Sequence, residues 1–356
     1  VDLNAGGTGT LVMPAGAMTV SANAALTGAL TLTDTGTAIT DSVSIVNRKT
    51  TALDIGAGNA INTNGYETLN ISSSGGVGTA TLTLGAITMA SDAGTTAAPG
   101  TDTVNFTGAQ KVTTGAITAE VINASGLTVA ATGTTFSMGA AAVGVTTITG
   151  SAGADTLVGD AKSTINGGGG KDNITGGSGN DTLNGGDAND TITTNAGNDT
   201  VSGGAGNDTI ISAGNLSKLD VIDGGDGTDT LSITNASLTA IKAMTITEVN
   251  AFNAALTSVE GLQTSDAWNQ GTFDLGYVSG VTTVTLGAGI TGAETIAGMA
   301  SGSTINMSVA LSDTLTTSVT GALGGTADTL NFNMVRNTTG TDYDAITIVD
   351  VETLNI

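Results

Sequence analysis

One nine-residue phrase repeats through the middle of the sequence and sets the strongest limit on its fold. From Gly176 to Ile210 the chain reads GGSGNDTLNGGDANDTITTNAGNDTVSGGAGNDTI, and each copy places an aspartate behind a glycine-rich run and ahead of one aliphatic residue. One such aliphatic in each nine residues cannot fill a globular core. The aspartates fall in strict steps of nine, at Asp172, Asp181, Asp190, Asp199 and Asp208.

This spacing fits a flattened coil with two short strands in each eighteen-residue turn. In such a coil each aliphatic points inward and stacks on its counterpart one turn away, while the glycine-rich segments form the loops at both edges. The inward aliphatics are then Ile174, Leu183, Ile192, Val201 and Ile210. The aspartates are expected in two stacks, with Asp172, Asp190 and Asp208 on one edge and Asp181 and Asp199 on the other.

Stacked carboxylates need a positive partner. Side chains at the ~4.8 Å spacing of neighbouring strands repel one another. Residues 150–232 hold 12 Asp against 3 Lys, and the whole chain has a formal net charge of -23. Ca²⁺ suits such a site because it accepts carboxylates and backbone carbonyls together. Glycine lets carbonyls turn inward, and we expect left-handed backbone at the asparagine before each aspartate, at Asn180, Asn189, Asn198 and Asn207.

The pattern extends at both ends when insertions are allowed. Asp155 precedes Asp172 by seventeen residues, one short of a full turn. Asp220 follows Asp208 after a three-residue insertion, and Asp229 then resumes the step of nine.

Two positions depart from the phrase. Thr164 takes the place where a further aspartate is expected, so we predict an incomplete site at that edge position. Thr194 and Asn195 replace the paired glycines ahead of Asp199, although the aspartate itself is kept.

The segments Gly167–Thr175, Gly176–Asn184 and Gly203–Ile211 closely resemble the calcium-binding nonapeptide of RTX (repeats-in-toxin) proteins, which build a parallel β-roll. The resemblance covers residues 150–232 only, and it implies that carboxylates and loop carbonyls of consecutive turns share several Ca²⁺ ions. The implied pairs are Asp155 with Asp172, Asp172 with Asp190, Asp190 with Asp208, Asp208 with Asp229, Asp181 with Asp199, and Asp199 with Asp220. The implied metal-site residues are Asp155, Gly167, Gly169, Asp172, Gly176, Ser178, Gly179, Asp181, Gly185, Gly186, Asp187, Ala188, Asp190, Gly197, Asp199, Gly203, Gly204, Ala205, Gly206, Asp208, Asp220, Gly225, Gly227 and Asp229.

The flanks, residues 1–149 and 233–356, read as short Thr-, Val- and Ile-rich β segments with glycine turns. Related phrases recur in them, as in YETLNI at 66–71, GTDTVNF at 100–106 and VETLNI at 351–356, either because stacked rungs share one backbone solution or because the phrase simply favours a strand. Short helices fit only 235–256 and 264–271. We therefore expect an all-β chain, with an N-terminal β domain (1–149), a central calcium-binding parallel β-roll (150–232) and a C-terminal β domain (233–356). The flanks would be irregular Thr/Gly-rich β-solenoid or β-sandwich-like segments.

Catalysis is disfavoured by the composition. The chain contains no His and no Cys, so the usual general base and every thiolate mechanism are absent. A pair of glutamates could still serve a glycoside hydrolase. The available residues are Glu67, Glu120, Glu248, Glu260, Glu294 and Glu352, of which Glu67, Glu248 and Glu352 lie in strand-like phrases that favour a structural role. We expect no enzyme.

Two further features leave alternatives open. Trp268, Phe273 and Tyr277 form an aromatic group in a chain with only 3% aromatics, and they would be a carbohydrate platform, a subunit contact or a plug of local core. Aspartates outside the repeats would bind more calcium or be solvated turn residues. These aspartates include Asp34, Asp41, Asp102, Asp328 and Asp344.

The flanks and the repeats together look like the RTX-bearing surface-layer (S-layer) proteins of Gram-negative bacteria, which are exported by type I secretion. This resemblance implies an extracellular, cell-surface structural subunit that self-assembles with calcium into a two-dimensional lattice, with surface glycan or lipopolysaccharide as a further partner. The alternative is an RTX adhesin segment or a calcium-dependent carrier module of a larger secreted protein. The negative charge argues against nucleic acid and anionic membranes, and the lack of a long apolar run against membrane insertion. We expect a soluble chain that is a processed form or an excised fragment.

Overall fold

The computed structural model describes the ranges 2–3, 9–13, 18–22, 29–34, 41–47, 53–54, 60–73, 81–90, 101–128, 136–138, 147–212, 216–288, 290–307, 315–319, 329–334, 346–349 and 353–355. The chain forms two compact units, Val1–Ile192 and Thr193–Ile356. The boundary lies inside the 150–232 segment. The division at residues 149 and 232 that composition suggests stays a prediction.

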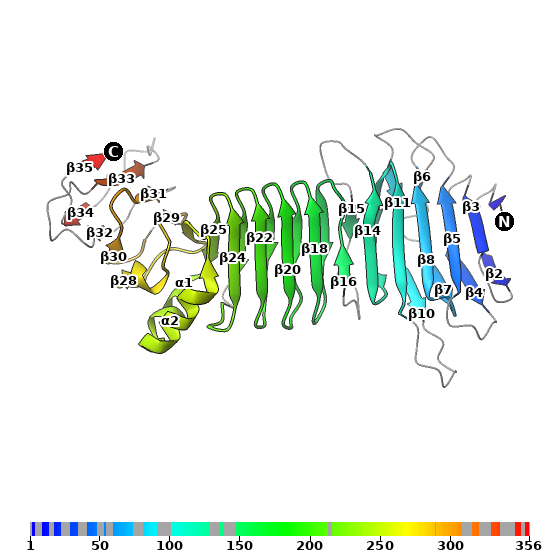
Figure 1. The fold of residues 1–356 in the computed structure, drawn as a ribbon, viewed down its shortest axis with the longest axis horizontal. Coiled ribbons are helices and arrows are strands. Elements are labelled where there is room, and N and C mark those ends of the chain that lie inside the picture. The colour runs from blue at the N-terminus through cyan, green and yellow to red at the C-terminus, as the bar shows by residue number, and fades with distance from the viewer. Residues whose placement is uncertain are drawn as a thin grey trace. The chain divides into compact units, whose positions relative to one another are not determined.

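The first unit is built from strands in three sheets (Figure 1). The first sheet has the order β1 (Asp2–Leu3), β3 (Met18–Ala22), β5 (Ser42–Asn47), β8 (Thr68–Ser73), β11 (Thr103–Gly108), β14 (Val121–Leu127), β16 (Thr147–Thr149), β18 (Thr164–Gly169), β20 (Thr182–Asp187). The second has the order β13 (Ile117–Thr118), β10 (Ile87–Ala90), β7 (Ile61–Asn64), β4 (Leu30–Asp34), β2 (Gly9–Met13). The third has the order β19 (Asn173–Thr175), β17 (Asp155–Val158), β15 (Phe136–Met138), β12 (Lys111–Thr114), β9 (Thr81–Thr83), β6 (Leu53–Asp54). Strand β21 (Thr191–Thr193) crosses the boundary between the units.

The second unit also carries its strands in three sheets. One has the order β22 (Thr200–Ala205), β24 (Val221–Asp226), β26 (Leu256–Thr257). Another has the order β35 (Thr353–Asn355), β33 (Thr329–Met334), β31 (Thr304–Met307), β29 (Thr283–Leu286), β27 (Gly261–Thr264), β25 (Thr230–Ile233), β23 (Thr209–Ser212). The last has the order β28 (Thr272–Asp274), β30 (Glu294–Met299), β32 (Leu315–Val319), β34 (Ile346–Val349).

The repeat segment coils as its period predicts, with parallel strands that belong alternately to two sheets. In the first unit Ile165 lies opposite Leu183 on one sheet, and Leu157 lies opposite Ile174 on the other. In the second unit Val201 lies opposite Ile222. One strand of each sheet therefore comes from every turn, and the prediction of a parallel β-roll is confirmed.

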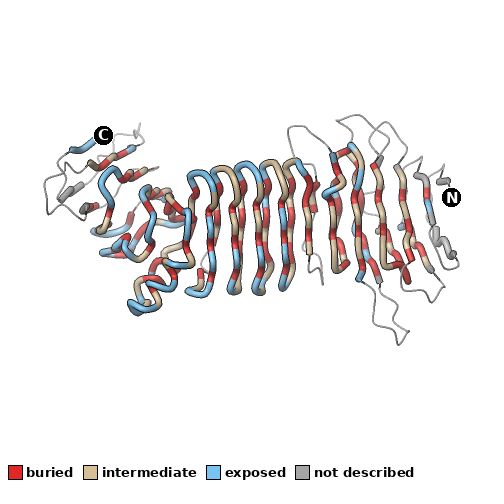
Figure 2. Tube along the Cα trace, in the orientation of Figure 1, coloured by how far each residue is buried: buried red, intermediate tan, exposed pale blue. Residues whose placement is uncertain are grey.

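The core of the coil is a narrow stack of single aliphatic side chains. Along each strand buried residues alternate with intermediate or exposed ones, as Figure 2 shows by its colour bands. Each buried aliphatic stabilises the fold by about 1.5–3 kcal/mol through removal from water, so every turn contributes a similar small amount. All five aliphatics predicted to point inward are at most 1% exposed: Ile174, Leu183, Ile192, Val201 and Ile210.

The flanks follow the same parallel stacking, and in the N-terminal flank the turns β5–β7, β8–β10 and β11–β13 each contribute strands to three sheets. The recurring phrases stack on one another, since Thr68–Asn70 lies opposite Thr103–Asn105 on neighbouring strands. A ladder of side-chain amides runs along this face, in which Asn105 donates to Asn70 and Asn123 donates to Asn105. The described flanks are thus solenoid-like, and the β-sandwich-like alternative is wrong for them because sandwiches pair their strands antiparallel.

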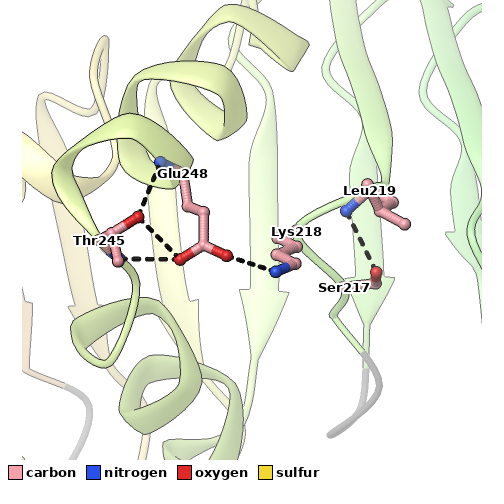
Figure 3. Close-up of polar contacts among 5 residues, drawn as sticks. All are labelled: Ser217, Lys218, Leu219, Thr245 and Glu248. Atoms are coloured by element: carbon pink, nitrogen blue, oxygen red, sulfur yellow. Dashed lines mark hydrogen bonds and ion pairs between the residues drawn. The ribbon is translucent and has the colours of Figure 1, made fainter.

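Both helices lie within 235–256, one of the two segments in which short helices are predicted. Helices α1 (Asn235–Lys242) and α2 (Ile246–Ala255) occupy the interval between β25 and β26. The Thr234 hydroxyl caps α1, and Thr245 forms a capping box with Glu248 at the start of α2 (Figure 3). Glu248 is therefore helical, which corrects the strand phrase expected there.

The second predicted helical segment, 264–271, is not helical. Trp268 forms an isolated parallel bridge with Ile290, and a short 3₁₀ turn (η1, Leu275–Tyr277) follows later. Trp268 and Phe273 are fully buried with their rings edge to face at 5.6 Å between centroids, and Phe273 also contacts Tyr277. Of the alternatives for this aromatic group, the plug of local core is confirmed.

Candidate metal centre

The repeat aspartates of the first unit bond to the backbone of the preceding turn. The N–H of Asp155 donates to Asp172 Oδ1, and the N–H of Asp172 donates to Asp190 Oδ1, each at 2.8 Å. Two of the implied pairs are thereby brought together. Each aspartate lies directly at the start of the next strand, so the strand register places the carboxylates in a column.

The second unit repeats this arrangement on its own turns. The N–H of Asp208 donates to Asp229 Oδ1 at 2.7 Å, and the N–H of Asp199 donates to Asp220 Oδ1 at 2.9 Å. Both bonds span 21 residues, as expected from the three-residue insertion. The insertion is therefore absorbed in a loop without disturbing the aspartate column.

One predicted position shifts by a residue. Ser163, not Thr164, occupies the place of the missing aspartate, because the Ser163 N–H donates to Asp181 Oδ1 at 2.7 Å. Thr164 instead lies opposite Thr182, the residue after Asp181. Counting nine residues back from Asp172 would have found Ser163. A hydroxyl replaces the carboxylate here, so this edge position lacks one anionic oxygen donor.

The second carboxylate oxygen of a repeat aspartate faces backbone oxygens. Asp172 is 1% exposed, and its Oδ2 has no hydrogen-bond partner in the described structure. A Cβ placed on Gly167 would lie 2.2 Å from Asp172 Oδ2 and 2.4 Å from the Gly185 carbonyl oxygen. A carboxylate oxygen and a carbonyl oxygen of the next turn therefore converge beside one glycine, which only a residue without a side chain permits.

The second unit shows the same convergence at Gly203. A Cβ there would lie 2.3 Å from the Gly224 carbonyl oxygen and 2.4 Å from Asp208 Oδ2. The equivalent position ahead of Asp155 is Gly150, whose Cβ would lie 2.2 Å from the Gly167 carbonyl oxygen. The glycine five residues before each of these aspartates thus has the same surroundings in both units.

The left-handed backbone falls two and four residues before the aspartate. Gly168 and Gly170 precede Asp172 with φ of 105° and 87°. Ala188 and Asn195 take up this conformation at equivalent positions with φ of 77° and 65°. Among the described residues the asparagines directly before the aspartates do not have positive φ, which corrects the expectation for them. The residue before the asparagine takes the left-handed conformation instead at Ala188, Gly197 and Gly206.

Burial makes these carboxyl groups resist ionisation. The pKa of Asp172 is raised from 3.8 to about 8, mainly by desolvation and to a smaller extent by the negative charges of Asp155 and Asp190. Desolvation also raises the pKa of Asp155 to about 6. The pKa values of three more repeat aspartates are raised for the same first reason, at Asp181, Asp220 and Asp229. Carboxyl groups of this kind are ionised in water at neutral pH. The fold places them at buried positions, where a positive charge would stabilise the ionised form.

These oxygens fit a hard divalent cation. Ca²⁺ takes six to eight oxygen ligands at 2.3–2.6 Å and combines carboxylates with backbone carbonyls. No three acidic side chains within the described ranges form a metal-binding group, and the oxygens that accompany each carboxylate here are carbonyls. Asp172 Oδ2 and the Gly185 carbonyl would hold such an ion, which would supply the positive charge that the buried carboxylates lack.

The other predicted site residues lie at the carboxyl ends of strands β18, β20, β22 and β24, or in the loops between strands. All eight predicted aspartates at the start of a strand are at most 3% exposed: Asp155, Asp172, Asp181, Asp190, Asp199, Asp208, Asp220 and Asp229. The side chain of Asp187 is exposed, so its predicted contribution is through the backbone. The remaining predicted residues, whose part in metal binding stays a prediction, are Gly167, Gly169, Gly176, Ser178, Gly179, Gly185, Gly186, Ala188, Gly197, Gly203, Gly204, Ala205, Gly206, Gly225 and Gly227.

Glutamates make the same bond outside the repeats. Glu67 Oε2 accepts from the Asp41 N–H at 2.7 Å, and Glu120 Oε2 accepts from the Asp102 N–H at 2.5 Å. Asp41 and Asp102 are each 5% exposed, so they are not solvated turn residues. The signal was present in the recurring phrases YETLNI and GTDTVNF, which place Glu67 and Asp102 directly before a strand. The side chain of Asp34, and residues Asp328, Asp344 and Glu352, lie outside the described residues.

Comparison with known protein families supports calcium binding by the repeat segment. Residues 144–161, 163–183, 184–214 and 219–232 match four copies of the RTX calcium-binding nonapeptide repeat. No curated protein and no solved structure matches the chain. The segment is therefore a calcium-binding RTX repeat module of the kind that occurs in secreted proteins. None of the helices in the described ranges is both long and apolar enough to cross a bilayer.

Proposed function

We propose that this chain is a segment of an extracellular structural subunit that folds with calcium and assembles on a bacterial cell surface, as S-layer subunits do. One observation carries the calcium part: Asp172 is buried with an oxygen that lacks a hydrogen-bond partner and faces the Gly185 carbonyl. Without a cation this carboxylate opposes folding, and with one it joins consecutive turns.

Assembly into a lattice is the finer part of the proposal. It is supported by the resemblance of the flanks to RTX-bearing S-layer proteins and by the scarcity of catalytic side chains, with no His and no Cys. The partners would be copies of the chain, with a surface glycan or lipopolysaccharide as anchor. Nucleic acid does not belong to the proposal, because the net charge of -23 repels polyanions. Membrane insertion does not belong to it either, because the sequence contains no long uninterrupted apolar run.

The alternative is an RTX adhesin segment or a calcium-dependent carrier module. It is favoured by the limited span of the repeats, whose matched copies end at residue 232 and leave two long flanks for other tasks. Glycan binding would support it. Trp268 is buried, however, so loss of binding in Trp268→Ala would report on packing and not on a sugar platform.

The first test is circular dichroism of the chain in chelator and in millimolar calcium. Calcium should increase the β signal and raise the melting temperature, whereas magnesium at equal concentration should do so far less because it prefers a rigid six-ligand shell. Identical spectra under all conditions would remove the calcium proposal.

The second test separates the two surface functions. Electron microscopy after calcium addition should show two-dimensional sheets if the subunit proposal holds. Persistent monomers that bind a glycan array in calcium would favour the adhesin, and monomers that bind nothing would favour the carrier module.

A further inference from the structure

The coil continues past the last nonapeptide in a different form. After β25, helices α1 and α2 form an insertion, and the chain returns to the coil as β26, which pairs with β24 through Leu256 and Thr257. The next strand of the other sheet, β27, begins at Gly261. The turn between them is Ser258–Glu260, which has no glycine-rich loop and lies outside the matched repeats.

The carbonyl of Ser258 takes the place of a repeat glycine carbonyl. A Cβ on Gly224 would lie 1.8 Å from the Ser258 carbonyl oxygen and 2.6 Å from Asp229 Oδ2. One turn earlier, the Gly224 carbonyl and Asp208 Oδ2 flank Gly203 in the same way. The convergence of one carboxylate oxygen and one carbonyl oxygen is therefore reproduced one turn beyond the repeats.

Glu260 takes the place of the repeat aspartate. Its Oε2 accepts from the Asp229 N–H at 2.9 Å, just as Asp229 Oδ1 accepts from the Asp208 N–H. Glu260 follows Ser258 by two residues, whereas Asp229 follows Gly224 by five. The shorter turn has less backbone to bring the carboxylate to the column, and the additional methylene of glutamate provides the missing reach.

A buried carboxylate oxygen without a partner points to a ligand at this turn. Asp229 is fully buried, and its Oδ2 has no hydrogen-bond partner in the described structure. Ser258 has φ of 52°, a conformation that costs a non-glycine residue of order 1–3 kcal/mol and is kept where the surroundings require it. Here it accompanies a carbonyl that lies beside the Asp229 carboxylate.

The charges around Asp229 add to the case. Asp208 and Glu260 flank it in the column, because the Asp208 N–H donates to Asp229 Oδ1 and the Asp229 N–H donates to Glu260 Oε2. Thr257 Oγ1 donates to Asp223 Oδ1, so the Asp223 side chain is already satisfied by β26. The buried carboxylate of Asp229 therefore lies between two further acidic residues of the column, whose charge a cation would balance.

We propose that a Ca²⁺ ion binds at this turn, held by Asp229 Oδ2, the Ser258 carbonyl and the Glu260 carboxylate. This inference rests on the proposed calcium chemistry of the repeats and adds a site beyond them. Since Ser258 and Glu260 directly follow the return strand of the insertion, the ion fastens residues 235–260 to the coil. Calcium then orders the helical insertion together with the repeats.

The test counts ions and locates their effect. Native mass spectrometry in calcium should show one ion fewer in Glu260→Gln than in the wild type. Glu248→Gln is the matched control, because it removes a glutamate charge from the insertion at a residue that pairs with Lys218 (Figure 3). The control should keep the wild-type number of ions.

Hydrogen exchange of the wild type provides a measurement that does not depend on a variant folding. Calcium should slow exchange in 256–261 by at least tenfold, and Glu260→Gln should lose that effect while residues 165–192 keep theirs. An unchanged ion count in folded Glu260→Gln, or no calcium effect on 256–261 in the wild type, would overturn this site alone. A wild type that binds no calcium at all, with no protection of 165–192, would overturn the proposed function as well.

Discussion

Replacing Asp172 by asparagine should change stability in opposite directions in chelator and in calcium. Burial first, and then the charges of Asp155 and Asp190, raise the pKa of Asp172 from 3.8 to about 8. Because one pKa unit corresponds to about 1.4 kcal/mol, ionisation of this group at pH 8 opposes folding without metal by up to ~6 kcal/mol. The buried asparagine amide has its own desolvation cost of about 1–3 kcal/mol. We therefore expect Asp172→Asn to stabilise the metal-free chain by up to roughly 3–5 kcal/mol.

In saturating calcium the same change removes a ligand. Each tenfold loss of affinity lowers the stability of the bound state by about 1.4 kcal/mol, so the variant should be less stable than the wild type. Urea unfolding followed by circular dichroism at pH 8, with chelator and with millimolar calcium, measures both signs. A suitable control is Asp187→Asn, which alters an exposed carboxylate of the next loop and should shift neither midpoint strongly.

The change in stability of Asp172→Asn in chelator decides whether a cation is needed. If Asp172→Asn destabilises the chain equally with and without calcium, the carboxylate acts only as a hydrogen-bond acceptor for the Asp155 N–H, and no cation is needed to explain its burial.

Further predictions concern pH, loop glycines, the incomplete site and the core. In chelator, the raised pKa of Asp172 means that its protonated form stabilises the folded state fully below pH 3.8, and this stability is lost as the pH rises towards 8, so melting temperatures should rise on acidification from pH 8 to pH 5. Gly167→Ala should abolish calcium-induced folding because its Cβ would meet two oxygens, whereas Gly169→Ala, whose Cβ meets nothing closer than 3.5 Å, should fold normally, as a calcium titration would show. Ser163→Asp should add one bound ion by native mass spectrometry and lower stability in chelator; an unchanged count would contradict its place in the column. Leu183→Ala should cost about 2–5 kcal/mol in calcium by urea unfolding.

Much of the fold of the repeat segment could be predicted because each nine-residue repeat contains both its core residue and its acidic residue. A period of nine with one aliphatic and one aspartate allows few solutions, and the two-strand turn, the inward aliphatics and the aspartate columns all agree with the structure. The position of Ser163 was missed by one residue, although the step of nine counted back from Asp172 leads to it.

The flanks yielded less because their turns vary in length and carry no fixed spacing. The acidic residue at the head of each recurring phrase was visible, yet its partner was not. Glu67 is bonded to Asp41 across 26 residues, and Glu260 to Asp229 across 31, so no local pattern links them. Likewise the aromatic residues near Trp268 could have been exposed or buried until packing was known.

The sequence by itself determined the parallel coil and its calcium chemistry, because both follow from which residue types recur and at what spacing. Only the tertiary structure decided which oxygens face one another across turns, since that depends on strand register and on how inserted segments rejoin the coil. The Ser258 carbonyl beside the Asp229 carboxylate illustrates the difference: no motif marks it, and only the return of the chain after two helices brings these oxygens together.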